Sequence, residues 1–274
     1  MSKTQELIFK IMDLSIDAIF IDDTSGNILM CNHAAEKMFG YNEGEMIGLN
    51  ISDLIPKEDC DYLQPKYKKE DLLEEIYIPR INKRKDGTLF PTEVNSKIVS
   101  AGESEYLIAF VRDMTEDSKI KDRLYYLSNY DELTELRNRR SIISLLSSQK
   151  ESYCLAMIDI DSFKQINDTY GHMVGDLFLK SFGFILKENK EIEAGRFGGE
   201  EFLVFIKTPN LKYAKRVMEN VLMDANKTLS LYGGIHFSCG VTMVNDLSVD
   251  AAINKTDKLL YQAKASGKNQ VIAE

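Results

Sequence analysis

Cysteine is scarce in this chain of 274 residues, which contains only Cys31, Cys60, Cys154 and Cys239. No two of them form a CxxC pair, so neither a zinc site nor a disulfide framework is indicated. Cys154 and Cys239 stand in apolar, strand-like runs, and this placement predicts two packed thiols.

Long apolar runs and an excess of basic residues are also missing. No stretch approaches the roughly 20 apolar residues of a membrane span, and residues 1–10 contain no secretory apolar core. The net charge is −9, whereas a general nucleic-acid binder usually carries a basic excess. These absences predict a cytoplasmic protein with no membrane span and no nucleic-acid partner, and the length predicts two domains.

Two adjacent glycines, Gly198 and Gly199, separate the apolar segments 192–197 and 202–206. Glycine pairs between strand-like runs predict a tight two-residue hairpin, because such turns need positive φ. Glu200 and Glu201 follow at once and, on a strand, would point to opposite faces. The turn is either a place where a phosphate and a metal ion approach the backbone, or a surface hairpin whose acids solvate its tip.

The first 115 residues predict an antiparallel sheet with helices over one face. Strands are expected at 18–21, 28–31, 75–81, 89–100 and 106–113, and short helices at 34–39 and 43–46. Turns are expected at 23–27, 86–87 and 101–103, where Gly, Asp, Asn and Ser gather.

This segment resembles a PAS sensor domain in three places: residues 28–41 (ILMCNHAAEKMFGY), residues 85–87 (KDG) and residues 113–115 (DMT). The resemblance implies a cavity between sheet and helices that holds a small ligand, and it leaves the ligand open. His33 is the only histidine before residue 172, so a haem held by a histidine of the central helix is not expected. The cysteine-centred flavin motif of light-sensing relatives is absent as well.

Residues 116–130 predict a polar helix with Ile120, Leu124 and Leu127 on one stripe. A narrow apolar seam suits pairing with a second copy of the helix, and packing on its own domain is the alternative. We therefore expect a PAS domain at 1–115, a helical linker at 116–130 and a second domain at 131–274.

The sequence pattern of the second domain predicts an α+β fold, with a sheet flanked by helices. Strands are expected at 153–160 and 269–272, and helices from the apolar stripes at 177–186, 211–225 and 249–265. Gly233 and Gly234 predict a second hairpin leading into the strand 235–241, and Gly267 predicts the end of the last helix.

Two acids, Asp159 and Asp161, leave the carboxyl end of the strand 153–160. Facing Glu200 on the hairpin, they would form an oxygen-rich site suited to Mg²⁺. Like charges about 4 Å apart cost roughly 4 kcal/mol at an effective dielectric constant of 20, so grouped acids imply a cation or a raised pKa. For Asp161 we favour a helix N-cap over a ligand role.

The string at 163–176 (FKQINDTYGHMVGD) and the run at 196–202 (RFGGEEF) closely resemble the GGDEF family of diguanylate cyclases. Residues 131–134 (DELT) and 138–140 (NRR) match the start of that domain, and residues 261–264 (YQAK) and 267–269 (GKN) match its end. The resemblance implies a cyclase that joins two GTP molecules into cyclic di-GMP and releases two pyrophosphates. Each domain would hold one GTP, so the active form would be a homodimer aligned by the linker and the PAS domain.

The same resemblance assigns roles to individual residues. Asp159, the carbonyl of Ile160 and Glu200 would hold Mg²⁺, and Glu200 would accept the proton of the attacking 3′-hydroxyl. Lys164 would stabilise charge on the phosphates during the reaction.

Eight residues are implied as substrate contacts: Phe163, Asn167, His172, Asp176, Gly198, Gly199, Lys264 and Lys268. Asn167 and Asp176 would read the guanine edge, with His172 nearby. The two glycines would admit the triphosphate, and the two lysines would contact its oxygens. A carboxylate accepts from guanine N1–H and N2–H₂, a donor pair that adenine lacks, so Asp176 predicts selectivity for GTP.

Taken singly, several of these residues have plainer interpretations. Asp176 could cap a helix, Asn167 and Asp168 could be turn residues, and His172 could be a structural loop residue. Arg196 could simply pair with a neighbouring acid.

The chain departs from the family pattern at three places. Glu135 stands where Gly is usual, and Lys268 where Arg is common; Lys keeps the charge but loses the bidentate fork. Residues 189–192 (NKEI) replace the inhibitory RxxD motif, which predicts little feedback inhibition by that route. Two further functions stay open: a binding module for GTP or cyclic di-GMP without turnover, and a cyclase with another nucleotide product.

Overall fold

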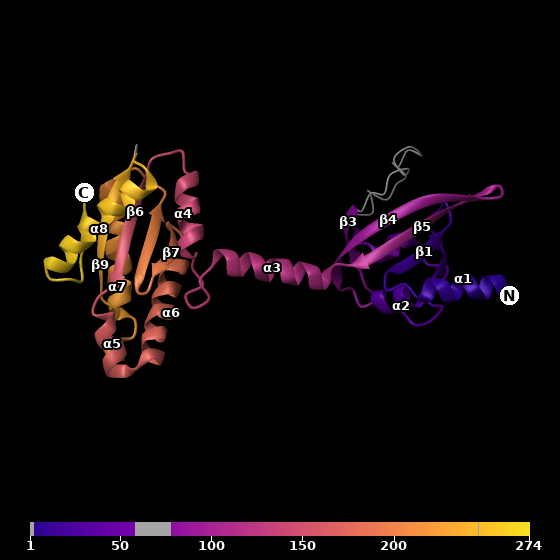
Figure 1. Ribbon diagram of the computed structural model, residues 1–274, viewed down its shortest axis with the longest axis horizontal. Coiled ribbons are helices and arrows are strands. Elements are labelled where there is room, and N and C mark those ends of the chain that lie inside the picture. Colours follow the sequence, from indigo (N-terminus) through magenta and orange to yellow (C-terminus); the bar gives the residue numbers. More distant parts are fainter. Residues whose placement is uncertain (1–2, 58–77, 246) are drawn as a thin grey trace. The chain divides into compact units, whose positions relative to one another are not determined.

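The computed structural model describes residues 3–57, 78–245 and 247–274. The chain divides into two compact units, Met1–Asp122 and Arg123–Glu274, and Figure 1 labels most of their elements. Both units combine one sheet with helices, which confirms the predicted α+β class. Among the residues described, no helix is long and apolar enough to span a bilayer.

The N-terminal unit is built on one antiparallel sheet in the order β2-β1-β5-β4-β3. Its elements are α1 (Lys3–Asp13), β1 (Ala18–Asp22), β2 (Ile28–Cys31), α2 (His33–Phe39), the 3₁₀ helix η1 (Ile51–Leu54), β3 (Ile78–Lys83), β4 (Leu89–Ala101) and β5 (Ser104–Asp113). The core lies between one sheet face and α2 with η1, around the edge-to-face rings of Phe20, Phe39 and Phe90.

Asn32 explains how the chain turns from β2 into α2. Its side-chain oxygen accepts from the backbone N–H of Ala35 at 3.0 Å and of Ile19 at 2.9 Å. Its amide group donates to the carbonyls of Met12 and Asp17, both at 3.0 Å. One buried side chain therefore caps α2 and ties α1 and β1 to it.

One expectation for this unit is wrong, and part of another lies outside the residues that the structure describes. Residues 43–48 form turns rather than the predicted helix, because Gly44 takes the left-handed φ of 77° and interrupts the helical path. The expected strand 75–81 appears as β3 from Ile78; residues 75–77 and Cys60 lie outside the described residues. Thiol packing is confirmed at Cys154 and Cys239, which are buried.

Helix α3 (Thr115–Asn129) carries the chain from the first unit into the second. None of its residues is buried. Ile120 and Leu124 are 56% and 62% exposed, and Leu127 is exposed on the same stripe. The predicted helix is confirmed, and its apolar stripe is not covered by the parts of this chain that the structure describes.

The C-terminal unit is built on a sheet in the order β10-β9-β6-β8-β7, antiparallel except for the parallel pair β10–β9. Its strands are β6 (Tyr153–Ile160), β7 (Ile192–Gly198), β8 (Glu201–Ile206), β9 (Phe237–Val244) and β10 (Val271–Ala273). Its helices are α4 (Arg139–Ser148), α5 (Phe163–Tyr170), α6 (His172–Glu188), α7 (Leu211–Lys227), η3 (Ser230–Tyr232) and α8 (Val249–Ala265).

Helices cover both faces of this sheet, so all eight residues of its central strand β6 are buried (Figure 1). Side chains alternate along a strand, and those of Ile158 and Ile160 join the core under α6 and α7. Those of Leu155 and Met157 join the second core, under α4 and α8. The alternation places Asp159, the next residue of that second series, on the α8 side.

Both glycine pairs lie differently from the prediction. The hairpin turn is Gly199–Glu200, while Gly198 ends β7 and pairs with Glu201 across a bulge. Only Gly199 takes positive φ there, 38°. Gly233 and Gly234, with φ of 95° and 85°, end the 3₁₀ helix η3 rather than a hairpin, so no strand precedes β9 at that point.

Candidate active site

Asp159 stands where three strands meet. It pairs with Glu201 on β8 and with Ser238 on β9. The backbone N–H of Ile160 donates to the carbonyl of Glu200 at 3.3 Å. The β6–β8 register therefore brings the hairpin turn beside the end of β6, and with it the three residues predicted to hold the metal.

Lys264 reaches this point from α8. Its Nζ lies 2.8 Å from Oδ2 of Asp159, and the two side chains are 36% and 12% exposed. Burial raises the pKa of Asp159, and the charges of Glu200 and Asp161 raise it further, while Lys264 opposes the shift. Lys264 thus supplies the positive charge that a desolvated carboxylate among other acids requires.

The second acid of the hairpin faces the same cluster. Burial raises the pKa of Glu201, and the negative charges of Asp159, Asp257 and Glu200 add to that effect, with Lys264 opposing it. Glu200 sits in the turn and is half-buried. Both glutamates are thus half-buried beside Asp159, Glu200 in the turn and Glu201 at the start of β8.

Asp161 is a structural residue, and the predicted N-cap role is wrong. Helix α5 begins after Ser162, which takes φ 58° and makes no side-chain cap bond. The carboxylate of Asp161 instead accepts from the hydroxyl of Ser238 at 2.8 Å and from the backbone N–H of Asn269 at 2.9 Å. It joins β6, β9 and the entry to β10, and these bonds use both of its oxygens.

The predicted guanine-reading residues lie on the paired helices α5 and α6. Asn167 is half-buried in α5, and a Cβ on Gly175 would come within 1.9 Å of its Oδ1. Asp176 is exposed in the second turn of α6 and therefore is no N-cap. Since α5 spans Phe163–Tyr170, Asn167 and Asp168 are helical rather than turn residues.

The remaining predicted contacts surround these helices. Phe163 is half-buried at the start of α5, and Lys164 beside it is exposed. His172 is the exposed first residue of α6, not a loop residue. Lys268 takes φ 63° after the end of α8, and its Nζ donates to the hydroxyl of Ser162 at 3.0 Å.

Arg196 forms an ion pair with an acid, which is the plainer interpretation of this residue, and the pair links the start of the unit to the hairpin. The sequence did not indicate which acid. Arg196 donates through Nε to the carbonyl of Gly199 at 2.9 Å and through a terminal nitrogen to Asp131 at 3.2 Å. Burial alone would raise the pKa of Asp131, but hydrogen bonds from Thr134 and the charge of Arg196 outweigh it and lower that pKa. The partner of Arg196 is thus 65 residues away in sequence.

The oxygen donors at the end of β6 fit a magnesium ion. In the part of the chain that the structure covers, no three His, Cys, Asp or Glu side chains form a ready-made metal cage. Mg²⁺ usually binds through one or two carboxylates and completes its six positions with substrate phosphates and water. Two carboxylates and one carbonyl match that mode better than an all-protein site.

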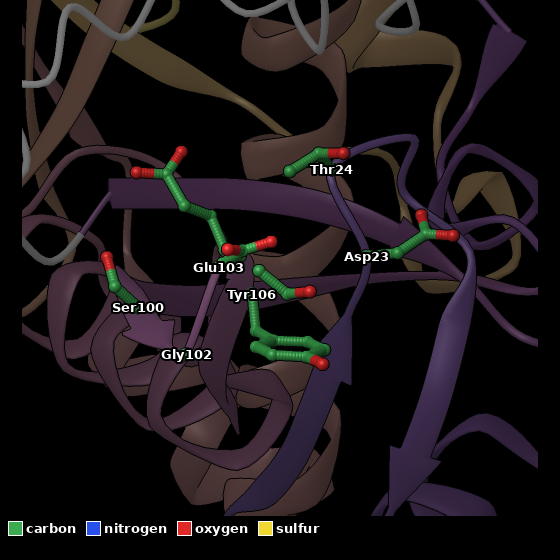
Figure 2. Close-up of a pocket in the computed structure, with 8 residues that line it drawn as sticks. Asp23, Thr24, Ser100, Gly102, Glu103 and Tyr106 are labelled. Carbon is green, nitrogen blue, oxygen red and sulfur yellow. The ribbon is translucent and has the colours of Figure 1, made fainter.

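A separate pocket of about 650 Å³ lies in the N-terminal unit between the β1–β2 turn and the tip of the β4–β5 hairpin (Figure 2). Its lining includes Asp23, Glu103, Glu105 and Tyr106. The carboxylate of Asp23 already accepts from the backbone N–H groups of Ser25 and Asn27 and from the Asn27 amide, each at 2.9 Å. This pocket belongs to the N-terminal unit, whereas the acids at the end of β6 belong to the C-terminal unit.

Residues 128–270, more than half of the chain, match the family model "Diguanylate cyclase, GGDEF domain". The chain belongs to the GGDEF family. Residues 16–116 match the model of a PAS domain, so a PAS domain precedes the GGDEF domain, as the sequence motifs predicted.

Named relatives agree with this assignment at modest identity. The chain is 26% identical to diguanylate cyclase DgcM of Escherichia coli O157:H7. The match covers 94% of this chain and 66% of DgcM. It is 33% identical to diguanylate cyclase A of Treponema denticola over 54% of its length and 45% of that protein. The GGDEF chain described here thus spans less than two thirds of either relative.

Among solved structures, the chain resembles diguanylate cyclase SiaD of Pseudomonas aeruginosa in complex with its activator SiaC. The identity is 32%, the TM-score is 0.51, and the match covers 58% of this chain and 66% of SiaD.

Proposed function

We propose that this chain is an active diguanylate cyclase that condenses two GTP molecules into cyclic di-GMP and two pyrophosphates. The observation that carries the proposal is the cluster at the end of β6, where Asp159 meets Glu200 and Lys264. A GTP-consuming reaction and the chain's acidic balance both suit a cytoplasmic location.

Asp159, Glu200 and the carbonyl of Ile160 would hold Mg²⁺. The bound ion would neutralise triphosphate charge and lower the free energy needed to form the attacking oxygen nucleophile. Glu200 is the proposed acceptor of the 3′-hydroxyl proton, because it lies in the turn, half-buried beside the other acids.

Guanine would bind against α5 and α6. The carboxylate of Asp176 would accept from N1–H and N2–H₂, and the half-buried amide of Asn167 would hold a second edge of the base. Gly175 is needed there, since any side chain at that position would displace Asn167. Phe163 and His172 border the same helix pair, and the proposed outcome is selectivity for GTP over ATP.

The triphosphate would run from the base toward the hairpin. Gly199 has no side chain and a φ of 38°, and together with Gly198 it lets phosphate approach the backbone. Lys164, Lys264 and Lys268 would supply positive charge along the phosphates. Residues 189–192 offer no RxxD motif, so we propose little feedback inhibition through that position.

Catalysis would need two copies, because each cyclase domain holds one of the two nucleotides. The exposed stripe of α3, formed by Ile120, Leu124 and Leu127, supports pairing through that helix. Leu124→Glu should lower turnover at low protein concentration and shift the protein toward monomer in analytical ultracentrifugation. The matched control, Tyr125→Glu, adds the same charge at a position that is equally exposed but lies outside the stripe, and it should leave both unchanged.

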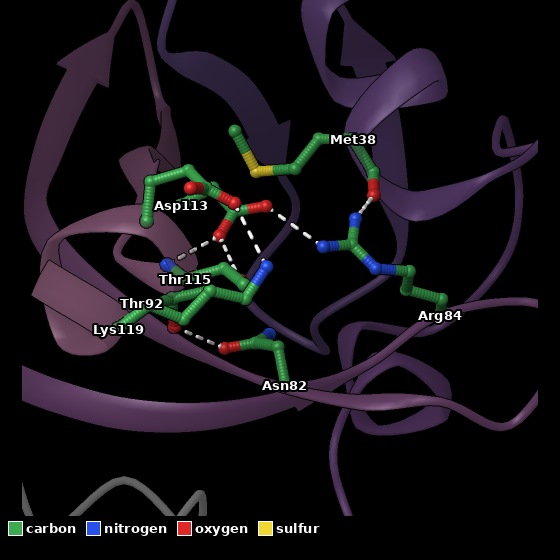
Figure 3. Close-up of polar contacts among 8 residues, drawn as sticks. Met38, Asn82, Arg84, Thr92, Asp113, Thr115 and Lys119 are labelled. Carbon is green, nitrogen blue, oxygen red and sulfur yellow. Dashed lines mark hydrogen bonds and ion pairs between the residues drawn. The ribbon is translucent and has the colours of Figure 1, made fainter. Parts of the chain in front are cut away.

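Regulation by the PAS domain would act through the start of α3. The carboxylate of Asp113 accepts from the backbone N–H of Thr115 at 2.8 Å, and Arg84 donates to the same carboxylate at 2.8 Å. Arg84 also donates to the carbonyl of Met38 and stacks 3.7 Å from the ring centre of Phe90. Figure 3 shows the hydrogen bonds of Arg84 with Met38 and Asp113 and those of Asp113 with Thr115. Through these bonds, a change in the PAS core would reach the first turn of the linker helix.

The proposal is tested by incubating the pure protein with Mg²⁺ and GTP and identifying the products by mass. Cyclic di-GMP and pyrophosphate are expected, with little turnover of ATP. GTP binding without any product would identify the chain as a regulatory binding module instead, and comparable use of ATP would refute the role given to Asp176.

A further inference from the structure

Lys264 and the metal that we propose for this site require the same carboxylate. The Nζ atom of Lys264 is 2.8 Å from Oδ2 of Asp159, and Asp159 is the buried one of the two carboxylates in the proposed ligand set. Lys264 therefore already neutralises the residue on which a divalent cation would be held.

The two cations cannot both stay in contact with this carboxylate at low cost. Mg²⁺ binds an oxygen at about 2.1 Å, which would place it only a few ångströms from the ammonium group. Repulsion between positive charges at such a distance is strong where burial limits screening, and Asp159 is largely desolvated. Binding of the metal must therefore displace the ammonium.

The displaced side chain has a place to go. Lysine carries a compact charge on a flexible four-carbon stem, and the Lys264 side chain is one third exposed. In the proposed reaction the triphosphate arrives at this end of the sheet together with the metal and would accept the released ammonium.

Resting on the proposed function, we infer that Lys264 is a resident counter-ion that holds Asp159 until a divalent cation and a triphosphate enter together. It weakens binding of the metal alone and strengthens the coupling between metal and nucleotide. By linkage, metal and nucleotide must then raise each other's affinity by the same factor.

Lys268 provides a matched comparison. It is close to Lys264 in sequence and is also a proposed phosphate contact, but its Nζ donates to the hydroxyl of Ser162. Removing its charge leaves the contact between Lys264 and Asp159 in place.

The test measures Mn²⁺ binding to the full chain without nucleotide, from the electron paramagnetic resonance signal of free Mn²⁺. Lys264→Met should bind Mn²⁺ about tenfold more tightly than the wild type, because the competing charge is gone. Lys268→Met should change the affinity by less than about twofold, since its charge is not on the carboxylate. Lys264→Arg keeps a cation at Asp159 and should gain no affinity.

A second measurement examines coupling with β,γ-methylene GTP, which does not react. The analogue should raise Mn²⁺ affinity by a larger factor in the wild type than in Lys264→Met. The factor in Lys268→Met should stay close to that of the wild type.

The outcomes separate this inference from the proposed function. If Lys264→Met binds Mn²⁺ no more tightly than the wild type while Asp159→Asn weakens binding, the counter-ion role is wrong and the metal site stands. If Asp159→Asn changes nothing in any background, the metal site itself is wrong and the inference falls with it. Should Lys264→Met fold poorly, a gain of affinity in Lys264→Arg would overturn the inference by itself.

Discussion

Replacing Asp22 by Asn should stabilise the N-terminal unit at neutral and alkaline pH. Asp22 is fully buried, and neither of its carboxylate oxygens has a hydrogen-bond partner among the described residues. It follows Phe20 on the core face of β1. Burial, with a smaller contribution from the charge of Asp23, raises the pKa of Asp22 to about 7.

The size of the effect follows from that pKa. In the unfolded chain the group has its ordinary value of 3.8, so the native state binds the proton more tightly. The part of the stability that this tighter proton binding contributes is fully present below pH 3.8. It is lost as the pH rises through about 7. The gap corresponds to about 4 kcal/mol as an upper bound. An Asn amide without partners still costs about 1–3 kcal/mol, so Asp22→Asn should gain about 1–3 kcal/mol at pH 8.

The assay is urea unfolding at pH 5, 6, 7 and 8, followed by far-ultraviolet circular dichroism because the chain contains no tryptophan. The wild type should lose stability in the transition of the N-terminal unit as the pH rises, and Asp22→Asn should be nearly flat. Asp86→Asn is the control of opposite sign, because hydrogen bonds from Thr88 lower the pKa of Asp86. A wild-type stability that does not fall between pH 5 and pH 8 would refute the reasoning.

Three further predictions concern the GGDEF unit. Gly175→Ala places a Cβ 1.9 Å from Oδ1 of Asn167, so the KM for GTP should rise about tenfold with a smaller change in kcat; an unchanged KM would contradict the base-reading role of Asn167. Arg196 holds the carbonyl of Gly199 in the turn at 2.9 Å. Arg196→Met removes this hydrogen bond and should lower kcat about tenfold with little change in KM. A loss of stability with an unchanged kcat would contradict this role. Glu135→Gly relieves a left-handed φ of 57°. This relief should outweigh the loss of the exposed ion pair with Lys187 and raise the melting temperature; a lower melting temperature would show that the ion pair contributes more than the backbone strain costs.

Elements with strong periodicity were predictable from the sequence. The strand 153–160 and the helix 249–265 have the predicted bounds. In β6 both faces are covered by helices, so its apolar run is nearly continuous, and in α8 a Ser N-cap and Gly267 mark the limits. Local chemistry decides such boundaries.

The glycine pairs show where local reasoning fails. A glycine signals that positive φ is tolerated, but it does not fix which residues occupy the turn. A bulge beside Phe197 shifts the hairpin by one residue and makes Glu200 part of the turn. At Gly234 a Cβ would lie 2.3 Å from the carbonyl oxygen of Asn226, a tertiary constraint that the sequence does not display.

The main contacts of the site are also non-local. Lys264 contacts Asp159 although it lies near the C-terminal end of the domain's sequence. The carboxylate of Asp161 accepts from the backbone N–H of Asn269, which is 108 residues away in sequence. The motifs indicated that these residues belong to one site. Only the side-chain contacts of the folded unit show that Asp161 is structural and that Lys264 is already paired.

The central claim is that acids from the end of β6 and from the hairpin turn form the catalytic site for GTP condensation. The most direct measurement compares cyclic di-GMP formation by the wild type, Glu200→Gln and the exposed control Glu188→Gln, at saturating Mg²⁺ and GTP. The account predicts that Glu200→Gln loses at least about 100-fold in rate while Glu188→Gln matches the wild type. Undiminished synthesis by Glu200→Gln would contradict the account.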